Sequence, residues 1–78
     1  MIADEVQAGF CRTGRMMSTD WEDVRPDILT LGKSMSGGVV PASGAVCDAF
    51  IMDHVGPGEH GSTYGGNPLA MACARAAV

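Results

Sequence analysis

Several signatures of common protein classes are absent from this chain of 78 residues. The five Lys and Arg side chains are scattered singly and the net charge is −4, so there is no basic stripe for nucleic acid. No apolar run approaches the ~20 residues that span a bilayer. No signal or transit peptide is visible, although a chain without its native N-terminus would show none. Binding to nucleic acid through a basic surface and a membrane span within the chain are therefore excluded.

Patterns that form metal sites and disulfides are also missing. Cys11, Cys47 and Cys73 are odd in number and far apart, and they form no C-x-x-C pair. This spacing fits neither a zinc site nor a disulfide scaffold, and it favours small buried thiols in a reducing compartment. His54 and His60 lie six residues apart, with no third ligand at helical spacing. We therefore expect no metal site.

The hydrophobic content of 46% predicts a globular fold. The chain is shorter than the ~100–150 residues of a typical domain, so it has room for one small core. The first residues read as a buried strand, and residues 70–78 read as an unfinished helix. Neither end has the loose, polar sequence of a natural terminus. The pattern predicts an internal fragment, with no domain boundary within residues 1–78.

The apolar segments predict an α/β fold that begins with two parallel strands. Residues 1–4 read as the first strand, and Pro26 keeps the chain extended into the second, residues 27–31. The connector between them, residues 5–26, holds a possible short helix near residues 19–23. Its length of about 22 residues is sufficient for the crossover that a parallel pair requires.

The following segments predict one antiparallel strand and two helices. Residues 33–41 are too few and too rich in Gly for a crossover helix, so the strand at residues 42–47 should pair antiparallel with the one before it. The result is a mixed sheet of two parallel strands and one antiparallel strand. A short helix is expected at residues 49–54, and a longer one begins at Asn67, a good N-cap. Its predicted apolar face consists of Leu69, Ala72, Cys73 and Ala76.

An acid and an amine follow the two predicted parallel strands. Asp4 and Lys33 would then face one another at the carboxyl ends of the strands, where open α/β sheets bind cofactors. An amine there can form a Schiff base, and a carboxylate can keep a pyridinium nitrogen protonated. Gln7 could reach the same ring. The alternatives are a solvated strand-end lysine, a polar strand exit at Asp4 and Glu5, and a surface glutamine.

Two loops could bind an anion. Hydroxyls and flexible amides in residues 61–68 come immediately before a helix N-terminus, which favours phosphate, although a capped turn explains them equally well. The loop matches neither the P-loop nor the dinucleotide fingerprint. Arg12 and Arg15 form a second candidate, for which surface ion pairs are the more common outcome.

Three blocks of sequence resemble the class III, pyridoxal-phosphate-dependent aminotransferases over essentially the whole chain. The blocks are IADEVQAGFCRTGR (2–15), RPDILTLGKSMSGG (25–38) and GEHGSTYGGNPLA (58–70). Within this class they are most similar to the ornithine aminotransferase subfamily, with the acetylornithine and 4-aminobutyrate aminotransferases as close neighbours.

The resemblance implies the aspartate-aminotransferase-like fold (fold type I), with residues 1–78 as the central part of its large cofactor domain. The implied cofactor is pyridoxal 5'-phosphate, bound covalently through Lys33, which is also the catalytic residue. Asp4 would pair with the ring nitrogen, Gln7 would hydrogen-bond the ring hydroxyl, and Val6 would pack against the ring.

The resemblance also implies partners and a reaction. Thr63, with Ser62 as a weaker candidate, would reach the cofactor phosphate of the neighbouring subunit, in a homodimer or higher homo-oligomer with shared active sites. The complete protein would move the δ-amino group of ornithine to 2-oxoglutarate, a step of amino-acid metabolism linked to proline biosynthesis. It would be soluble, in the mitochondrial matrix of a eukaryote or the cytoplasm otherwise. Because the substrate-binding arginines and the main phosphate loop lie elsewhere, the competing hypothesis is that the isolated fragment is a non-catalytic α/β piece.

Overall fold

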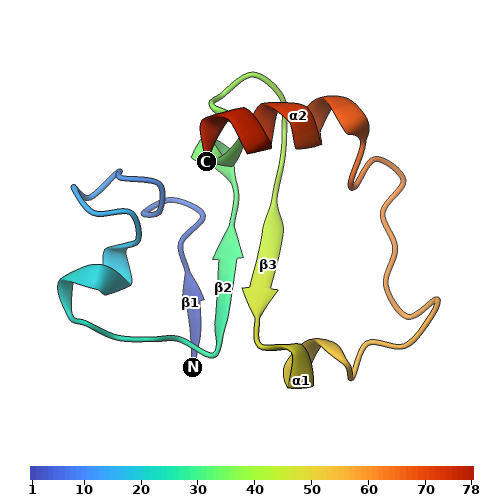
Figure 1. Ribbon diagram of the computed structural model, residues 1–78, viewed down its shortest axis with the longest axis horizontal. Helices are drawn as coiled ribbons and strands as arrows, with labels where there is room; N and C mark the ends of the chain where they lie inside the picture. The colour runs from blue at the N-terminus through green and yellow to red at the C-terminus, as the bar shows by residue number, and fades with distance from the viewer.

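The computed structural model describes all 78 residues, as a three-stranded sheet with short helices around it (Figure 1). In chain order the elements are the strand β1 (Ile2–Asp4), the 3-10 helix η1 (Ser18–Trp21), β2 (Ile28–Leu31), the 3-10 helix η2 (Lys33–Ser36), β3 (Gly44–Cys47), and the α-helices α1 (Ala49–Met52) and α2 (Pro68–Ala77).

The sheet has the predicted mixed topology. Its strand order is β1-β2-β3, with β1 and β2 parallel and β2 and β3 antiparallel. The third strand begins at Gly44, two residues later than expected. Gly44 pairs with Leu31, the last residue of β2, and the chain then leaves the sheet in η2, so residues 42 and 43 have no strand to pair with.

The short helices differ from the predicted ones in type and length. The helix expected near residues 19–23 is a single 3-10 turn, η1, and a second 3-10 turn, η2, lies where only a Gly-rich link was expected. Helix α1 ends at Met52 because the chain tightens there, with His54 N donating to Ile51 O at 3.2 Å.

Helix α2 packs on η2 through a different face from the one expected. Ala70 and Ala74 are buried, whereas Leu69 is 63% exposed. The approach is close, since a Cβ added at Gly37 would lie 3.4 Å from the Cβ of Ala77. Small side chains allow this approach. Periodicity did not predict the face, because nearly every position of the helix is apolar.

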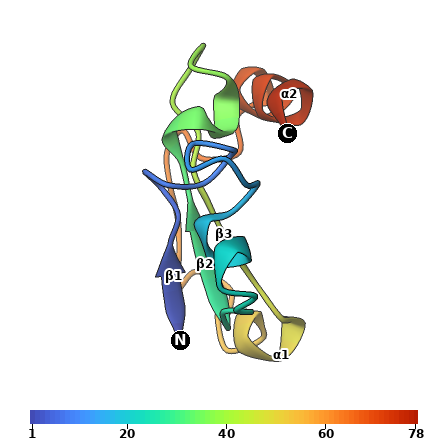
Figure 2. The same ribbon diagram turned by 90° about the vertical axis from the view of Figure 1, so that its left-hand side faces the viewer.

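The fold is a thin slab with little core of its own. It measures 37 × 31 × 16 Å, and its buried apolar side chains are Leu31, Ala70 and Ala74. The accessible surface is 5692 Å², about 1,200 Å² more than a folded monomer of its mass should expose. Figure 2 shows the sheet nearly edge-on, with α1 and α2 on the same side of it.

None of the helices has the length and apolarity needed to cross a membrane.

The cysteines are not buried, contrary to the prediction. Cys11 is exposed in a turn, and Cys47 and Cys73 are half-buried; all three are unbridged. Cys47 and Cys73 lie on β3 and α2, whose outer surfaces this chain leaves uncovered.

Candidate active site

The candidate site lies at the edge of the sheet where both parallel strands end. Asp4 is the last residue of β1, and Lys33 follows β2 after a single glycine. Because β1 and β2 run in the same direction, these ends come side by side, at the upper end of the sheet in Figure 1. The predicted juxtaposition of the two segments is therefore present.

The Asp4 carboxylate is oriented by two donors on the same oxygen. Its Oδ1 accepts from the backbone amide of Val6 at 3.0 Å and from the Thr30 hydroxyl at 3.2 Å. The parallel register places Thr30 beside Asp4. Oδ2 accepts no hydrogen bond within this chain, so the exposed carboxylate keeps one oxygen for a cationic partner. Sequence reasoning missed Thr30, although aligning the strands at Ile2 and Ile28 would have indicated it.

Lys33 combines a polar partner with an unusual backbone. Its amine donates to the side-chain oxygen of Gln7, so the structure brings together two of the predicted cofactor residues. Lys33 has φ of +45°, a left-handed conformation for a residue with a side chain. Such a conformation costs on the order of 1–3 kcal/mol and persists where neighbouring structure imposes it, often at functional sites.

Val6 packs beside the lysine segment. A Cβ added at Gly32 would lie 3.3 Å from Cγ1 of Val6 and 3.7 Å from Cβ of Ser43. A side chain at position 32 would therefore crowd the half-buried Val6, which would have to give by a few tenths of an ångström, and glycine avoids this contact.

Glu5 is buried inside the turn and is not part of a solvated strand exit. It is 1% exposed. Its Oε1 accepts from the Ser18 hydroxyl at 2.7 Å and the Thr19 amide at 3.0 Å, and its Oε2 accepts from the Ser18 amide at 3.1 Å. Burial acts to raise the pKa of the Glu5 carboxyl, but the hydrogen bonds from Ser18 and Thr19 outweigh it, and the pKa lies below its usual value of 4.5. The Glu5 carboxylate thereby connects η1 to the segment that follows Asp4 through three hydrogen bonds.

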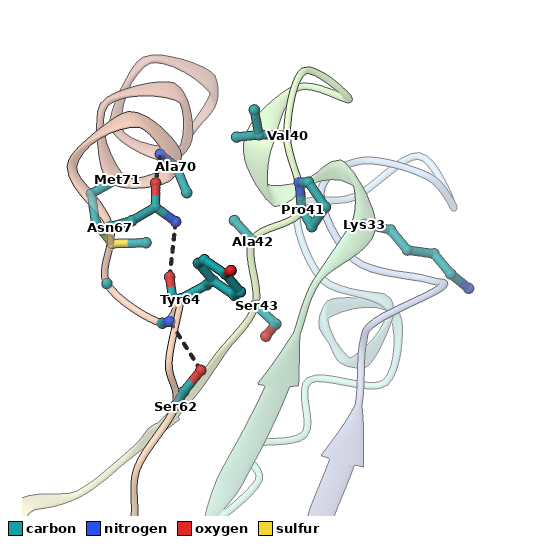
Figure 3. A pocket seen from close by; sticks show the side chains of 12 residues that line it. Lys33, Val40, Pro41, Ala42, Ser43, Ser62, Tyr64, Asn67, Ala70 and Met71 are labelled. Atoms are coloured by element: carbon teal, nitrogen blue, oxygen red, sulfur yellow. Dashed lines mark hydrogen bonds between the residues drawn. The ribbon is translucent and has the colours of Figure 1, made fainter.

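A pocket beside the site contains Ser62 but not Thr63 (Figure 3). Lys33 contributes to its wall, yet the Lys33 amine points away from Ser62, Tyr64 and Asn67. The lining residues are Lys33, Val40, Pro41, Ala42, Ser43, Ser62, Tyr64, Gly65, Gly66, Asn67, Ala70 and Met71. The structure therefore does not gather Ser62 and Thr63 around the amine of Lys33 in the same chain.

The loop before α2 satisfies part of its own hydrogen bonding. Ser62 Oγ accepts from the Gly65 amide at 2.9 Å. Asn67 is the predicted N-cap, accepting from the Ala70 amide at 2.9 Å and donating to the Tyr64 carbonyl at 2.9 Å. Thr63 is exposed, and its hydroxyl takes part in no hydrogen bond within this chain. Its hydroxyl remains available to a ligand or to another chain.

The two arginines of the first loop form no ion pairs, contrary to the common outcome expected for them. Arg12 donates to the Ser34 hydroxyl at 2.9 Å. Arg15 lies over the Trp21 ring, 4.6 Å from its centroid. Both guanidiniums thus contact neutral groups, and Arg12 does so next to Lys33.

Chemically, the arrangement pairs a nucleophilic amine with an oriented carboxylate. A primary amine condenses with an aldehyde, and a carboxylate with an available oxygen can hold a protonated heterocyclic nitrogen. These residues fit the ring portion of pyridoxal phosphate. The structure brings no three potential metal ligands together.

The class III aminotransferase profile matches this chain over residues 1–78, and the chain belongs to that family. It is 55% identical to the mitochondrial ornithine aminotransferase of Arabidopsis thaliana over 78 residues, 100% of this chain and 16% of the relative.

Two examples represent the solved structures that are similar to this chain over 97% of its length. One is an ornithine aminotransferase from Toxoplasma gondii, crystallized in the presence of oxidized glutathione and with PLP at partial occupancy at its active site; the TM-score is 0.94, with 58% identity and 18% of that chain covered. The other is an acetylornithine aminotransferase from Elizabethkingia anophelis, with a TM-score of 0.93, 58% identity and 19% of that chain covered. The chain thus spans less than a fifth of each of these three proteins.

Proposed function

We propose that the complete protein carrying this chain transfers the δ-amino group of ornithine to 2-oxoglutarate, yielding glutamate-5-semialdehyde and glutamate. The reaction needs no external oxidant or reductant. The amine-bearing carbon of the donor is oxidised to an aldehyde carbon, while the oxo carbon of the acceptor is reduced to an amine-bearing carbon. The observation that carries the proposal is the contact between the Lys33 amine and Gln7 beside an oriented Asp4. The ornithine aminotransferases among its relatives support the choice of donor.

The cofactor for this reaction is pyridoxal 5'-phosphate, which supplies an aldehyde and an electron-withdrawing ring. Lys33 would hold it through Nζ, and its amine, once released, would move a proton at the donor carbon. Lys33 is the only lysine in the sequence. Its partner Gln7 offers an amide that accepts from or donates to the polar atoms of the ring.

Asp4 and Val6 orient the ring in this proposal. Because Oδ1 of Asp4 already accepts from two donors, Oδ2 is the oxygen that would accept a hydrogen bond from the protonated ring nitrogen. The negative charge keeps that nitrogen protonated, which is the state in which the ring withdraws electrons best. Val6, fixed over Gly32, covers an apolar part of the ring.

Ser62 and Thr63 serve a neighbouring copy in this proposal. Their hydroxyls bind the phosphate of the cofactor held by the partner subunit, so the working unit is a homodimer or a higher homo-oligomer with shared sites. Two observations support this arrangement. The Lys33 amine points away from Ser62 in the same chain (Figure 3), and the exposed Thr63 hydroxyl makes no hydrogen bond within the chain. The complete domain has fold type I, and the protein is located in the mitochondrial matrix if its source is a eukaryote, as for the mitochondrial relative from Arabidopsis thaliana, and in the cytoplasm otherwise.

A second donor remains a specific alternative. The acetylornithine aminotransferase structure has the same 58% identity as the ornithine aminotransferase structure, so identity over this stretch does not separate the two substrates. 4-Aminobutyrate is a third ω-amine of the same kind.

The test uses the complete protein reconstituted with pyridoxal 5'-phosphate. Borohydride reduction followed by peptide mapping should place the cofactor on Lys33, and Lys33→Ala should lose the adduct and transamination. Arg25→Ala is the control, since the Arg25 side chain makes its one hydrogen bond and ion pair with Asp48 at 2.8 Å, away from the site. Glutamate-5-semialdehyde should form from ornithine faster than aldehyde forms from N-acetylornithine or 4-aminobutyrate. An intact adduct in Lys33→Ala would refute the role of Lys33, and a preference for another donor would refute the substrate.

A further inference from the structure

We infer that Arg12 is a positioning residue that holds the Lys33 segment in place through Ser34. The inference rests on the proposed function, because it assigns Lys33 the reacting amine. Arg12 donates from Nη2 to Ser34 Oγ at 2.9 Å, across 22 positions of sequence. Since Ser34 directly follows Lys33, this hydrogen bond acts one residue from the reacting amine.

The loop that presents Arg12 is held in a strained shape. Phe10 and Cys11, immediately before Arg12, have φ of 54° and 64°, the left-handed region that side chains disfavour. Several contacts hold the loop. The Cys11 amide donates to the Met16 carbonyl at 3.2 Å, the Trp21 indole donates to the Thr13 carbonyl at 3.1 Å, and Arg15 lies over the Trp21 ring. The loop is therefore braced against η1, and its conformation directs Arg12 toward η2.

The bond from Arg12 is the only hydrogen bond between residues 8–16 and residues 33–40. Helix η2 is restrained on its other side by the packing of α2 and by the buried Ser36, whose hydroxyl donates to the Val40 carbonyl. Within it, the Met35 amide donates to Gly32 and the Gly37 amide donates to Ser34, both at 3.0 Å. Because Lys33 has a disfavoured φ of +45°, an added restraint on the next residue raises the population of the conformation in which its amine meets Gln7.

An arginine suits this role better than a lysine would. The hydrogen bond is charge-assisted, and the planar guanidinium fixes the direction of its donors. Arg12 and Lys33 also share the wall of a small pocket with Ser34, Gly37 and Gly38, which contains no apolar side chain. This setting leaves a second role to test, in which Arg12 binds a substrate carboxylate.

The first experiment measures hydrogen exchange at residues 33–37 in the complete protein stripped of cofactor. The variants are Arg12→Ala, Arg12→Lys and Ser34→Ala, with Arg25→Ala as the matched control. Arg25 makes a similar exposed bond, 2.8 Å to Asp48, far from Lys33. We expect exchange at the Met35 and Gly37 amides to accelerate several-fold in all three variants and not in the control.

The second experiment measures the holoenzyme with whichever amine donor the wild type uses best. Small misplacements of reacting groups reduce rates by up to about 100-fold, so we expect kcat to fall about 10- to 100-fold in Arg12→Ala with little change in KM. The pH at which the absorbance of the lysine-bound cofactor changes should shift as well. Ser34→Ala should reproduce these effects more weakly, and the double variant should add little to Arg12→Ala.

Other outcomes overturn the inference. A rise in KM alone would assign Arg12 to substrate binding, and wild-type behaviour of Ser34→Ala would show that the bond is without consequence. Should Arg12→Ala fail to fold, Ser34→Ala, which removes one hydroxyl, decides the question. A wild type with no cofactor on Lys33 would instead refute the proposed function, whereas the exchange experiment on cofactor-free protein would stand independently.

Discussion

Removing the Glu5 carboxylate should loosen the segment that supports the candidate site. Glu5 is 1% exposed and accepts three hydrogen bonds, from the Ser18 amide, the Ser18 hydroxyl and the Thr19 amide. It lies between Asp4 and Val6, two of the proposed cofactor residues. Glu5→Ala therefore leaves two backbone donors of η1 without an acceptor.

The size of the effect follows from these bonds. A hydrogen bond to a charged group contributes about 1.5–3 kcal/mol, and an orphaned buried partner costs about 1–3 kcal/mol. Ser18 and Thr19 are half-buried, so water replaces part of the loss. We expect the free energy of local opening to fall by about 2–4 kcal/mol, because the two effects overlap. Glu5→Gln keeps one acceptor oxygen but turns an N–H₂ toward a donor, so its cost should be about 1–2 kcal/mol.

The assay is amide hydrogen exchange over residues 17–24 of the complete protein. A loss of 2–4 kcal/mol corresponds to about a 30- to 700-fold fall in protection. Glu59→Ala is the matched control, since Glu59 also accepts from a backbone amide, that of Gly56 at 2.7 Å, but is exposed. The control should leave residues 17–24 unchanged. A change of less than about threefold in Glu5→Ala would refute the reasoning, because it would mean that the three bonds contribute no net stability.

Three further outcomes are expected. Thr30→Val keeps the shape of the side chain but removes the hydroxyl that donates to Asp4, so the affinity of the complete protein for cofactor should fall about 2- to 10-fold, measured by cofactor release. The control Thr13→Val, at an exposed position, should leave this affinity unchanged. Equal affinities of Thr30→Val and the wild type would refute the orienting role of Thr30. The pKa of the Glu5 carboxyl is lowered in the folded state, so the stability that this carboxylate gives to η1 is present above the unfolded pKa of about 4.5 and is lost as the pH falls through the lower folded pKa. Protection of η1 against hydrogen exchange that does not depend on pH below 4.5 would contradict this. The isolated 78-residue chain should form no stoichiometric borohydride-reducible adduct at Lys33, because about 1,200 Å² of excess surface leaves its sheet uncovered; such an adduct would contradict the prediction.

Local features of the fold could be predicted because they depend on neighbouring residues. Asn67 before Pro68 predicted the start of α2, since an N-cap acts within one turn of the chain. The lengths of the two connectors predicted one parallel and one antiparallel pair. With the strands in this order, the ends at Asp4 and Lys33 had to meet at one edge of the sheet.

Other features depend on groups far apart in sequence. The burial of Glu5 requires η1 to fold over it, 13 residues on, and the orientation of Asp4 requires Thr30 at the same register of the next strand. No local pattern identifies such partners. The buried face of α2 was likewise set by its close packing on η2, because an almost uniformly apolar helix has no unique face.

The sequence by itself thus determined which chemical groups are present and in which order the strands deliver them to the edge of the sheet. Only the tertiary structure decided how they are held. It placed the Lys33 amine on Gln7, gave Lys33 its left-handed backbone and brought Arg12 to Ser34. The physical reason is that the two hydrogen bonds join segments more than 20 residues apart. Their geometry, and the backbone conformation of Lys33 between them, depend on tertiary packing, which no short stretch of sequence contains.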